Sequence, residues 1–353
     1  MALDDAALAG AVIPPTRAEG SGLQPSFDLH TPAARDGEWL VRPILLLAAL
    51  CSGLVVTVVV AFVFWRAWPL WHLEGLKFLT TSGWDSQLED AWNSGGVTFG
   101  ALPLVVGTVL TTVGSVLIAG VVGTGAAVFL AELAPKWLRG PVEAVVQLMA
   151  GIPSVVYGLV GLAVVVPYIM NNMIPDNAGQ VLPDVPLDGT CLLAGIAVLS
   201  FMILPFFVSV ALDALRAVPR SYMDGGMALG MTRWRAITTL QIPAATPGLV
   251  AGIVLASSRA VGEAIALSMV AGSLAMVPEF NHGVLYTALQ PIRTMASAIV
   301  DTGADASDVP SIASAMFALA SVLLAVSLGL SLTSRWAFKL FNMRNNVVSE
   351  RRV

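Results

Sequence analysis

Long apolar stretches, separated by short polar, charged or proline-rich segments, make up most of the chain. Six of them exceed the roughly 20 residues that a helix needs to cross a hydrocarbon core of about 30 Å. We therefore predict an all-α, polytopic membrane protein. Its expected spans are residues 44–65, 101–130, 142–169, 190–212, 246–276 and 311–334. Pro153 and Pro205 fall inside two of these spans and are expected to kink them.

Basic residues are distributed unevenly between the two sides that these spans define. Fourteen of the 18 lysines and arginines fall in one alternating set of segments and three in the other, while Arg259 lies within the fifth span. Cytoplasmic segments retain positive charge during insertion, so both termini are expected in the cytoplasm. The opposite segments collect Asp and Glu, which either keep loops solvated or repel an anion that arrives without an escorting protein.

The N-terminal 40 residues mix Pro, Gly, Ser and acidic side chains without any period, which predicts a disordered cytoplasmic tail. The first apolar run begins near Ile44, too late and too long for a cleaved signal peptide. We expect an uncleaved first span.

Composition excludes several classes of function. The chain is 56% hydrophobic and 12% charged, whereas soluble proteins carry roughly 25% charged residues. Its basic residues form no groove for nucleic acid. Cys51 and Cys191 lie in apolar runs and are expected to act as small hydrophobic residues, and His30, His72 and His282 lack the spacing of ligands. We expect no metal site, no cofactor and no catalytic residue.

Residues 213–243 form the longest inward connection and carry helix signals. Pro219 and Ser221 predict a helix start, and Gly230 a break. Apolar residues at helical spacing follow until Pro243, which we expect to stop the run. Such a pair of short helices either inserts into a groove on a soluble partner or lies at the membrane surface without one.

Two charged residues fall inside the fifth predicted span. Arg259 and Glu263 lie deep in the membrane if the helix is unbroken, and their i, i+4 spacing places them on one face, where they can pair. Each charge costs a few kcal/mol there on insertion scales. Either the two line a substrate path, or they form an ion pair that locks this helix against a neighbour.

No phosphate-binding loop of the G-K-[ST] type is present. Lys77, Lys136 and Lys339 follow Leu, Pro and Phe, so this chain is not itself an ATPase and any ATP-derived energy must come from a separate subunit.

The connection at 213–243 resembles the "EAA" coupling loop of binding-protein-dependent ABC importers. The matching positions are Asp224, Gly225, Gly226, Gly230 and Pro243. Asp replaces the usual Glu and two glycines replace the usual alanines, and each glycine weakens a helix by about 1 kcal/mol relative to Ala. The resemblance implies that these residues couple the chain to a cytoplasmic ATPase dimer.

Five further segments, in the same order, resemble the phosphate-specific permeases of this group. They are residues 99–112, 129–135, 151–159, 203–206 and 258–266. The long N-terminal extension and the run G-E-A-I-A-L-S-M-V-A-G are more similar to the C-type subunit than to the A-type. The resemblance covers roughly residues 97–340.

The resemblance implies the MetI-like fold of a type I ABC importer permease. Together with the apolar pattern, it gives a five-helix permease domain at 99–340. The apolar pattern places a first transmembrane helix and an outer loop before it, at 41–98, and a cytoplasmic tail after it, at 341–353. The implied partners are a second, similar permease subunit, the ATPase dimer, an external phosphate-binding protein, inorganic phosphate and the lipid bilayer of the cell membrane. Arg259 would then offer its N–H groups to phosphate oxygens, and Glu263 would hold Arg259 or accept a hydrogen bond from protonated phosphate.

Other functions stay open at this point. Sulfate, molybdate or phosphonate are alternative substrates, and a membrane scaffold that reports phosphate status is an alternative of another class. An ion-coupled secondary transporter is a third, although it usually shows internal repeats. ATP dependence of uptake separates the last from an ABC importer.

Overall fold

The structure is a computed structural model that describes residues 38–183, 185–303 and 309–350. The tail predicted at residues 1–40 lies, up to residue 37, outside the described part. The chain divides into two units, residues 1–56 and 57–353. The first contributes only the N-terminal part of helix α1 (Glu38–Glu74), and everything below concerns the second.

The described residues form helices, some of them with a π-helical turn (η), and no strand beyond an isolated bridge between Gly272 and Ile292. After α1 they are, in chain order, α2 (Lys77–Thr80), α3 (Trp84–Ser94), α4 (Leu102–Val128), η1 (Phe129–Leu133), α5 (Lys136–Ala150), α6 (Ser154–Val160), η2 (Gly161–Val165), α7 (Val166–Asn172), α8 (Ala178–Val181), α9 (Leu192–Arg216), α10 (Arg220–Ala228), α11 (Arg233–Ala236), η3 (Ile237–Gln241), α12 (Ile242–Val261), α13 (Ile265–Val270), α14 (Val284–Leu289), α15 (Met295–Gly303) and α16 (Pro310–Glu350).

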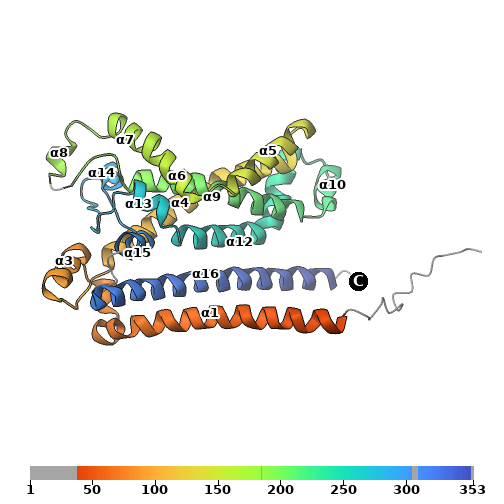
Figure 1. Cartoon of the computed structure of the whole chain (residues 1–353). Helices are drawn as coiled ribbons and strands as arrows, with labels where there is room; N and C mark the ends of the chain where they lie inside the picture. The colour runs from red at the N-terminus through yellow and green to blue at the C-terminus, as the bar shows by residue number, and fades with distance from the viewer. Residues whose placement is uncertain (1–37, 184, 304–308, 351–353) are drawn as a thin grey trace, which may run out of the picture. The chain divides into compact units, whose positions relative to one another are not determined.

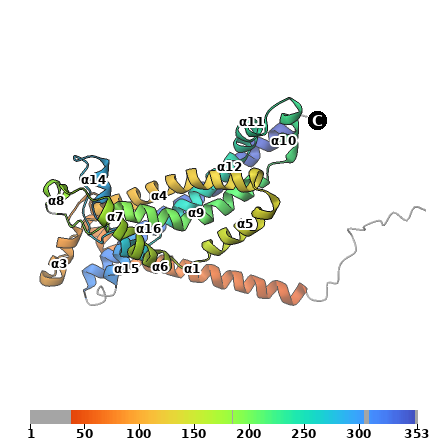
Figure 2. The ribbon, with the colours of Figure 1, turned by 90° about the horizontal axis from the view of Figure 1, so that it is seen from above.

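Six of these helical stretches are long and apolar enough to cross a membrane, which confirms the expected number of spans. They are Arg42–Glu74, Leu102–Leu133, Ser154–Asn172, Leu192–Arg216, Arg233–Val261 and Pro310–Ser334. Within the second unit, Figures 1 and 2 place α3, α8 and α14 at one end of the spans and α10 at the other. We call these the α3 end and the α10 end.

The third span begins later than the sequence predicts. Residues 142–169 were expected as one helix, but α5 ends at Ala150 and α6 begins at Ser154. Pro153 has an extended ψ of 142° at the N-cap of α6, so it separates two helices and does not kink one. The Tyr157 hydroxyl donates to the Met149 carbonyl at 2.9 Å and ties the two helices together across the break.

The fifth span differs at both ends from the prediction. Pro243 does not stop a helix: α11, η3 and α12 form one helical stretch, and Pro243 lies in the first turn of α12. The Ile242 N–H bonds to the Ile237 carbonyl, five residues back, so the turn before Pro243 is wider and accommodates a residue that lacks an N–H. At the other end the helix stops at Val261, and α13 is a separate short helix.

Helix α9 is the centre of the packing and lies beside α4, α12 and α5 (Figure 2). It runs unbroken through Pro205. Glycines on the neighbouring spans let its side chains approach closely. A Cβ on Gly123 of α4 would lie 2.5 Å from the Phe207 ring, and one on Gly252 of α12 would lie 3.2 Å from the same ring. The fully buried Phe207 therefore fills space that two missing side chains leave.

Candidate functional site

Arg259 and Glu263 lie on opposite sides of a helix break. Arg259 is in the last turn of α12, Gly262 follows the end of that helix, and Glu263 precedes α13. The two described side chains form no ion pair with each other. The alternative in which they pair at i, i+4 on one unbroken helix face is therefore not realised, because the helix ends between them.

Each of the two charges is compensated by backbone or ring atoms instead. Arg259 lies where the negative end of the α12 dipole favours a cation, and its guanidinium carbon is 5.7 Å from the centre of the Phe206 ring. Glu263 Oε1 accepts a hydrogen bond from the Ala266 N–H of α13 at 3.1 Å. Arg259 is exposed and Glu263 is half-buried. No carboxylate therefore competes for the guanidinium of Arg259 within the described chain.

The short helix after Glu263 is fixed against the third span. A Cβ on Gly158 of α6 would lie 3.1 Å from the Ala266 Cα and 2.8 Å from the Met269 sulfur, so only glycine permits this approach. Both segments belong to motifs on which the resemblance rests, residues 151–159 and 258–266. The structure brings these two motifs into contact.

The residues predicted to couple to an ATPase gather at the α10 end. Asp224 and Gly225 are exposed on α10, whereas Gly226 is buried on the same helix. A Cβ on Gly226 would meet Leu240 Cδ1 at 2.7 Å. Gly230 has φ of +83°, a left-handed conformation that ends α10 and favours glycine. Pro243 is exposed but lies in the fifth span. The predicted pair of short helices is therefore wrong: α10 is one short helix, and α11 is the start of the fifth span.

One polar cluster at this end joins residues about a hundred positions apart, which the sequence does not predict. Glu132, in η1, accepts hydrogen bonds from the side chains of Gln241 in η3 and Arg233 in α11. The sequence signal was an acidic residue at the very end of an apolar run, inside the motif at 129–135. An acid there indicates a charge placed at the membrane surface, but not its partner a hundred residues away.

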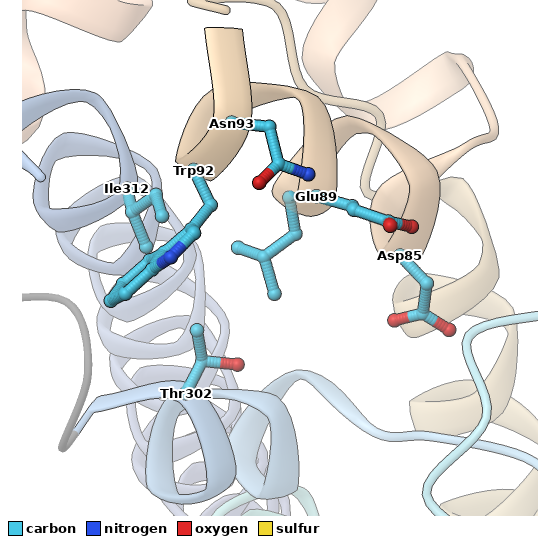
Figure 3. A pocket seen from close by; sticks show the side chains of 7 residues that line it. Asp85, Glu89, Trp92, Asn93, Thr302 and Ile312 are labelled. Carbon is cyan, nitrogen blue, oxygen red and sulfur yellow. The ribbon is translucent and has the colours of Figure 1, made fainter. Parts of the chain in front are cut away.

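A second polar cluster lies at the α3 end. Arg293 donates to Asp85 of α3 at 3.2 Å and to Asp301 of α15 at 3.3 Å, and Asp85 also accepts from the Ala275 N–H at 2.8 Å. Beside it opens a groove of about 570 Å³ (Figure 3). Its lining comes from α3, α15 and α16 and consists of Asp85, Leu88, Glu89, Trp92, Asn93, Thr302 and Ile312.

Six helical stretches long enough to cross a membrane, with the short helix α10 at one end of them, define a polytopic membrane protein. The chain belongs to the family of binding-protein-dependent transport system inner membrane components, which matches residues 123–342. The expected all-α importer permease fold is thereby confirmed, and the family description names a binding protein as a requirement of such systems.

Curated relatives cover much of the chain. The phosphate transport system permease protein PstC of Xylella fastidiosa is 32% identical over 87% of this chain and 94% of its own length. PstC of Pasteurella multocida is 30% identical over 80% and 85%. The probable ABC transporter permease YqgH of Bacillus subtilis is 40% identical, over 58% of this chain and 60% of its own length.

A solved structure of the methionine ABC transporter MetNI in an inward-facing conformation aligns with a TM-score of 0.45 and 17% identity, over 65% of this chain and 93% of that one.

Proposed function

We propose that this chain is the permease subunit of an ATP-driven importer that carries inorganic phosphate into the cytoplasm. The observation that carries the proposal is the similarity to phosphate permeases over most of the chain, together with a free arginine inside a span. A planar guanidinium presents several N–H donors and suits the oxygens of a tetrahedral oxyanion.

Arg259 is the proposed phosphate-contacting residue. Its charge is compensated by the end of α12 and the Phe206 ring and not by a carboxylate, so an arriving anion has no ion pair to break. The exposure of Arg259 in the single chain supports a path at the boundary with a second permease subunit. Glu263 holds the start of α13 and adds a negative charge that favours a protonated oxyanion over sulfate.

The α10 end is the proposed docking site for an ATPase dimer. We propose the cytoplasm for both termini as well, on the distribution of basic residues along the sequence. Asp224 and Gly225 are exposed on α10, as a docking helix requires, while Gly226 seats that helix on the chain. An external binding protein delivers phosphate at the α3 end. This arrangement is a two-state switch that ATP binding biases.

The test is ATP-dependent phosphate uptake in vesicles that contain the whole complex. Arg259→Gln and Glu263→Gln are compared with wild type at matched assembly. Arg66→Gln is a matched control, because the Arg66 guanidinium lies over the Phe317 ring at 5.5 Å in a different span. We expect Arg259→Gln to reduce uptake by roughly 10- to 150-fold, as for the loss of a charge-assisted contact, with ATP hydrolysis retained.

The outcomes separate the alternatives. Equal uptake in Arg259→Gln and wild type would remove Arg259 from the path. Uptake that sulfate or molybdate abolishes by competition would assign another oxyanion. Uptake that continues without ATP would contradict the importer itself.

A further inference from the structure

The second span ends in carbonyl groups that its own helix does not use. The last carbonyls of any helix lack intrahelical partners, and η1 ends at Leu133. Two arginines supply the missing donors: Arg139 Nη2 of α5 donates to the Ala131 carbonyl at 2.8 Å, and Arg233 Nη2 of α11 donates to the Glu132 carbonyl at 2.5 Å. Helix C-termini favour such cations. The end of the second span is thus bonded to α11, more than a hundred residues later.

The Glu132 side chain strengthens the same connection. Its Oε1 accepts from Gln241 Nε2 at 2.8 Å, and its Oε2 lies 3.4 Å from Arg233 Nη2. Gln241 is 4% exposed, and its Nε2 also donates to the Leu215 carbonyl near the end of α9 at 3.4 Å. One buried amide therefore bonds the fifth span to both the second and the fourth. Hydrogen bonds to a charged acceptor are stronger than neutral ones.

The short helix α10 is seated directly on this connection. Gly226 of α10 packs against Leu240, the residue before Gln241, with room for no more than a hydrogen atom. An unbroken series of contacts therefore leads from Gly226 of α10 to Leu240 of η3. From the neighbouring Gln241 it continues to Glu132 of the second span and to the Leu215 carbonyl of the fourth.

We propose that Glu132, Gln241 and Arg233 form a joint that transmits movement of α10 to the second and fourth spans. The proposal rests on the proposed function, in which an ATPase moves α10. Glu132 is a positioning residue: it touches neither substrate nor nucleotide, and it determines whether spans move when α10 moves. Loss of the joint uncouples ATP hydrolysis from phosphate transport, while the permease and the ATPase dimer stay assembled.

The experiment measures phosphate uptake and ATP hydrolysis in the same vesicles that contain the whole complex. Glu132→Ala removes the side-chain hydrogen bonds to Gln241 and Arg233. Glu132→Gln keeps an acceptor for Gln241 and loses the charge. Arg233→Ala removes the arginine donor and leaves Gln241 in place. We expect the ratio of phosphate transported to ATP hydrolysed to fall about fivefold or more in Glu132→Ala, as for the loss of an ordinary coupling energy. Glu132→Gln is expected to be intermediate, with hydrolysis retained in every variant.

Glu143→Ala is the matched control. Glu143 pairs with Arg216 at the same end, and its side chain is 22% exposed against 21% for Glu132, but it makes no bond to α10, α11 or η3. Its loss removes an ion pair of similar exposure without touching the joint. We expect an unchanged ratio.

A crosslink distinguishes a joint from a general structural role. In a background without Cys51 and Cys191, Glu132→Cys with Gln241→Cys lacks the hydrogen bonds, and a short bis-methanethiosulfonate reagent replaces them by a covalent link. We expect the reagent to restore the ratio and a reducing agent to abolish it again. The proposal is overturned if Glu132→Ala keeps the wild-type ratio, if Glu143→Ala lowers it equally, or if the crosslink restores nothing. Wild-type vesicles that take up no phosphate would instead contradict the proposed function.

Discussion

Arg293 Nη1 lies 3.2 Å from Asp85 Oδ1, although 208 positions separate the two residues in the sequence. The Arg293 side chain is 11% exposed, and its other terminal nitrogen bonds to Asp301. One cation thus joins α3, which precedes the second span, to α15, which precedes the sixth. The main chain at Arg293 also packs closely against α4, because a side chain on Gly107 of that helix would collide with the Arg293 carbonyl.

Replacing Arg293 by Met is expected to destabilise the protein by about 2 to 3 kcal/mol, since two carboxylates lose their shared partner. This loss is smaller than the roughly 3 to 5 kcal/mol of a fully buried pair because Asp85 is 38% exposed. Denaturant unfolding in detergent measures it. Glu89→Gln is the control, because Glu89 is an exposed carboxylate on α3, the helix that carries Asp85. It is expected to change the free energy of unfolding by less than about 0.5 kcal/mol. Equal stability of Arg293→Met and wild type would contradict the prediction.

Two substitutions of Glu263 separate its charge from its hydrogen bond. Glu263→Ala removes the acceptor for the Ala266 N–H and is expected to lower stability by about 1 kcal/mol, the usual loss for a helix cap. Glu263→Gln keeps an acceptor oxygen and is expected to retain most of that stability. Thermal unfolding of both variants, beside uptake, is the measurement. If the two variants are equally destabilised, the hydrogen bond is not what Glu263 contributes.

Adjacent glycines on α10 offer a matched pair. Gly225→Ala adds a methyl group in open space and is expected to stabilise by up to about 1 kcal/mol through helix propensity. Gly226→Ala brings the same propensity gain but pushes against Leu240, so its net gain is expected to be smaller. Unfolding midpoints of both variants, and of Gly226→Ala with Leu240→Val, test this difference. A larger gain at Gly226 than at Gly225 would refute it.

Burial raises the pKa of the Cys191 thiol above its ordinary value, against the backbone N–H groups of Ala194 and Leu193, which lower it; the negative charge of Asp188 adds a smaller increase. The raised pKa contributes stability that is fully present below the ordinary thiol pKa and is lost as the pH rises through the higher, folded value. In a Cys51→Ala variant at neutral pH, we expect a maleimide to leave Cys191 unmodified in the folded protein and to modify it after a denaturing detergent has unfolded the chain. The decline in stability at alkaline pH is expected to be smaller in Cys191→Ala. Rapid labelling of the native protein would contradict the prediction.

Hydropathy predicted the number of spans, because a bilayer imposes length and apolarity on each span directly. The order of the motif segments predicted the family. Helix breaks were less predictable. Pro153 separates two helices, Pro205 lies inside one, and Pro243 follows a π-helical turn that accommodates it. The same residue type gives three outcomes because the neighbouring spans decide which backbone groups are satisfied.

The candidate site was predictable in its residues but not in its geometry. Arg259 and Glu263 stood out as charges inside an apolar run, yet the break after Val261 changed their partners. Glu132 and Arg293 did not stand out, since their partners lie about a hundred or two hundred residues away and no local pattern records such pairings.

The ring of Phe207 occupies the space that Gly123 and Gly252 leave open on two neighbouring spans. A larger residue at Gly123 therefore requires a smaller side chain at position 207, and one at Gly252 requires the ring to shift slightly. A smaller side chain at 207 leaves a void that a larger residue at 123 or 252 can fill. The side-chain sizes at these three positions therefore depend on one another. Among homologues they should change together or not at all.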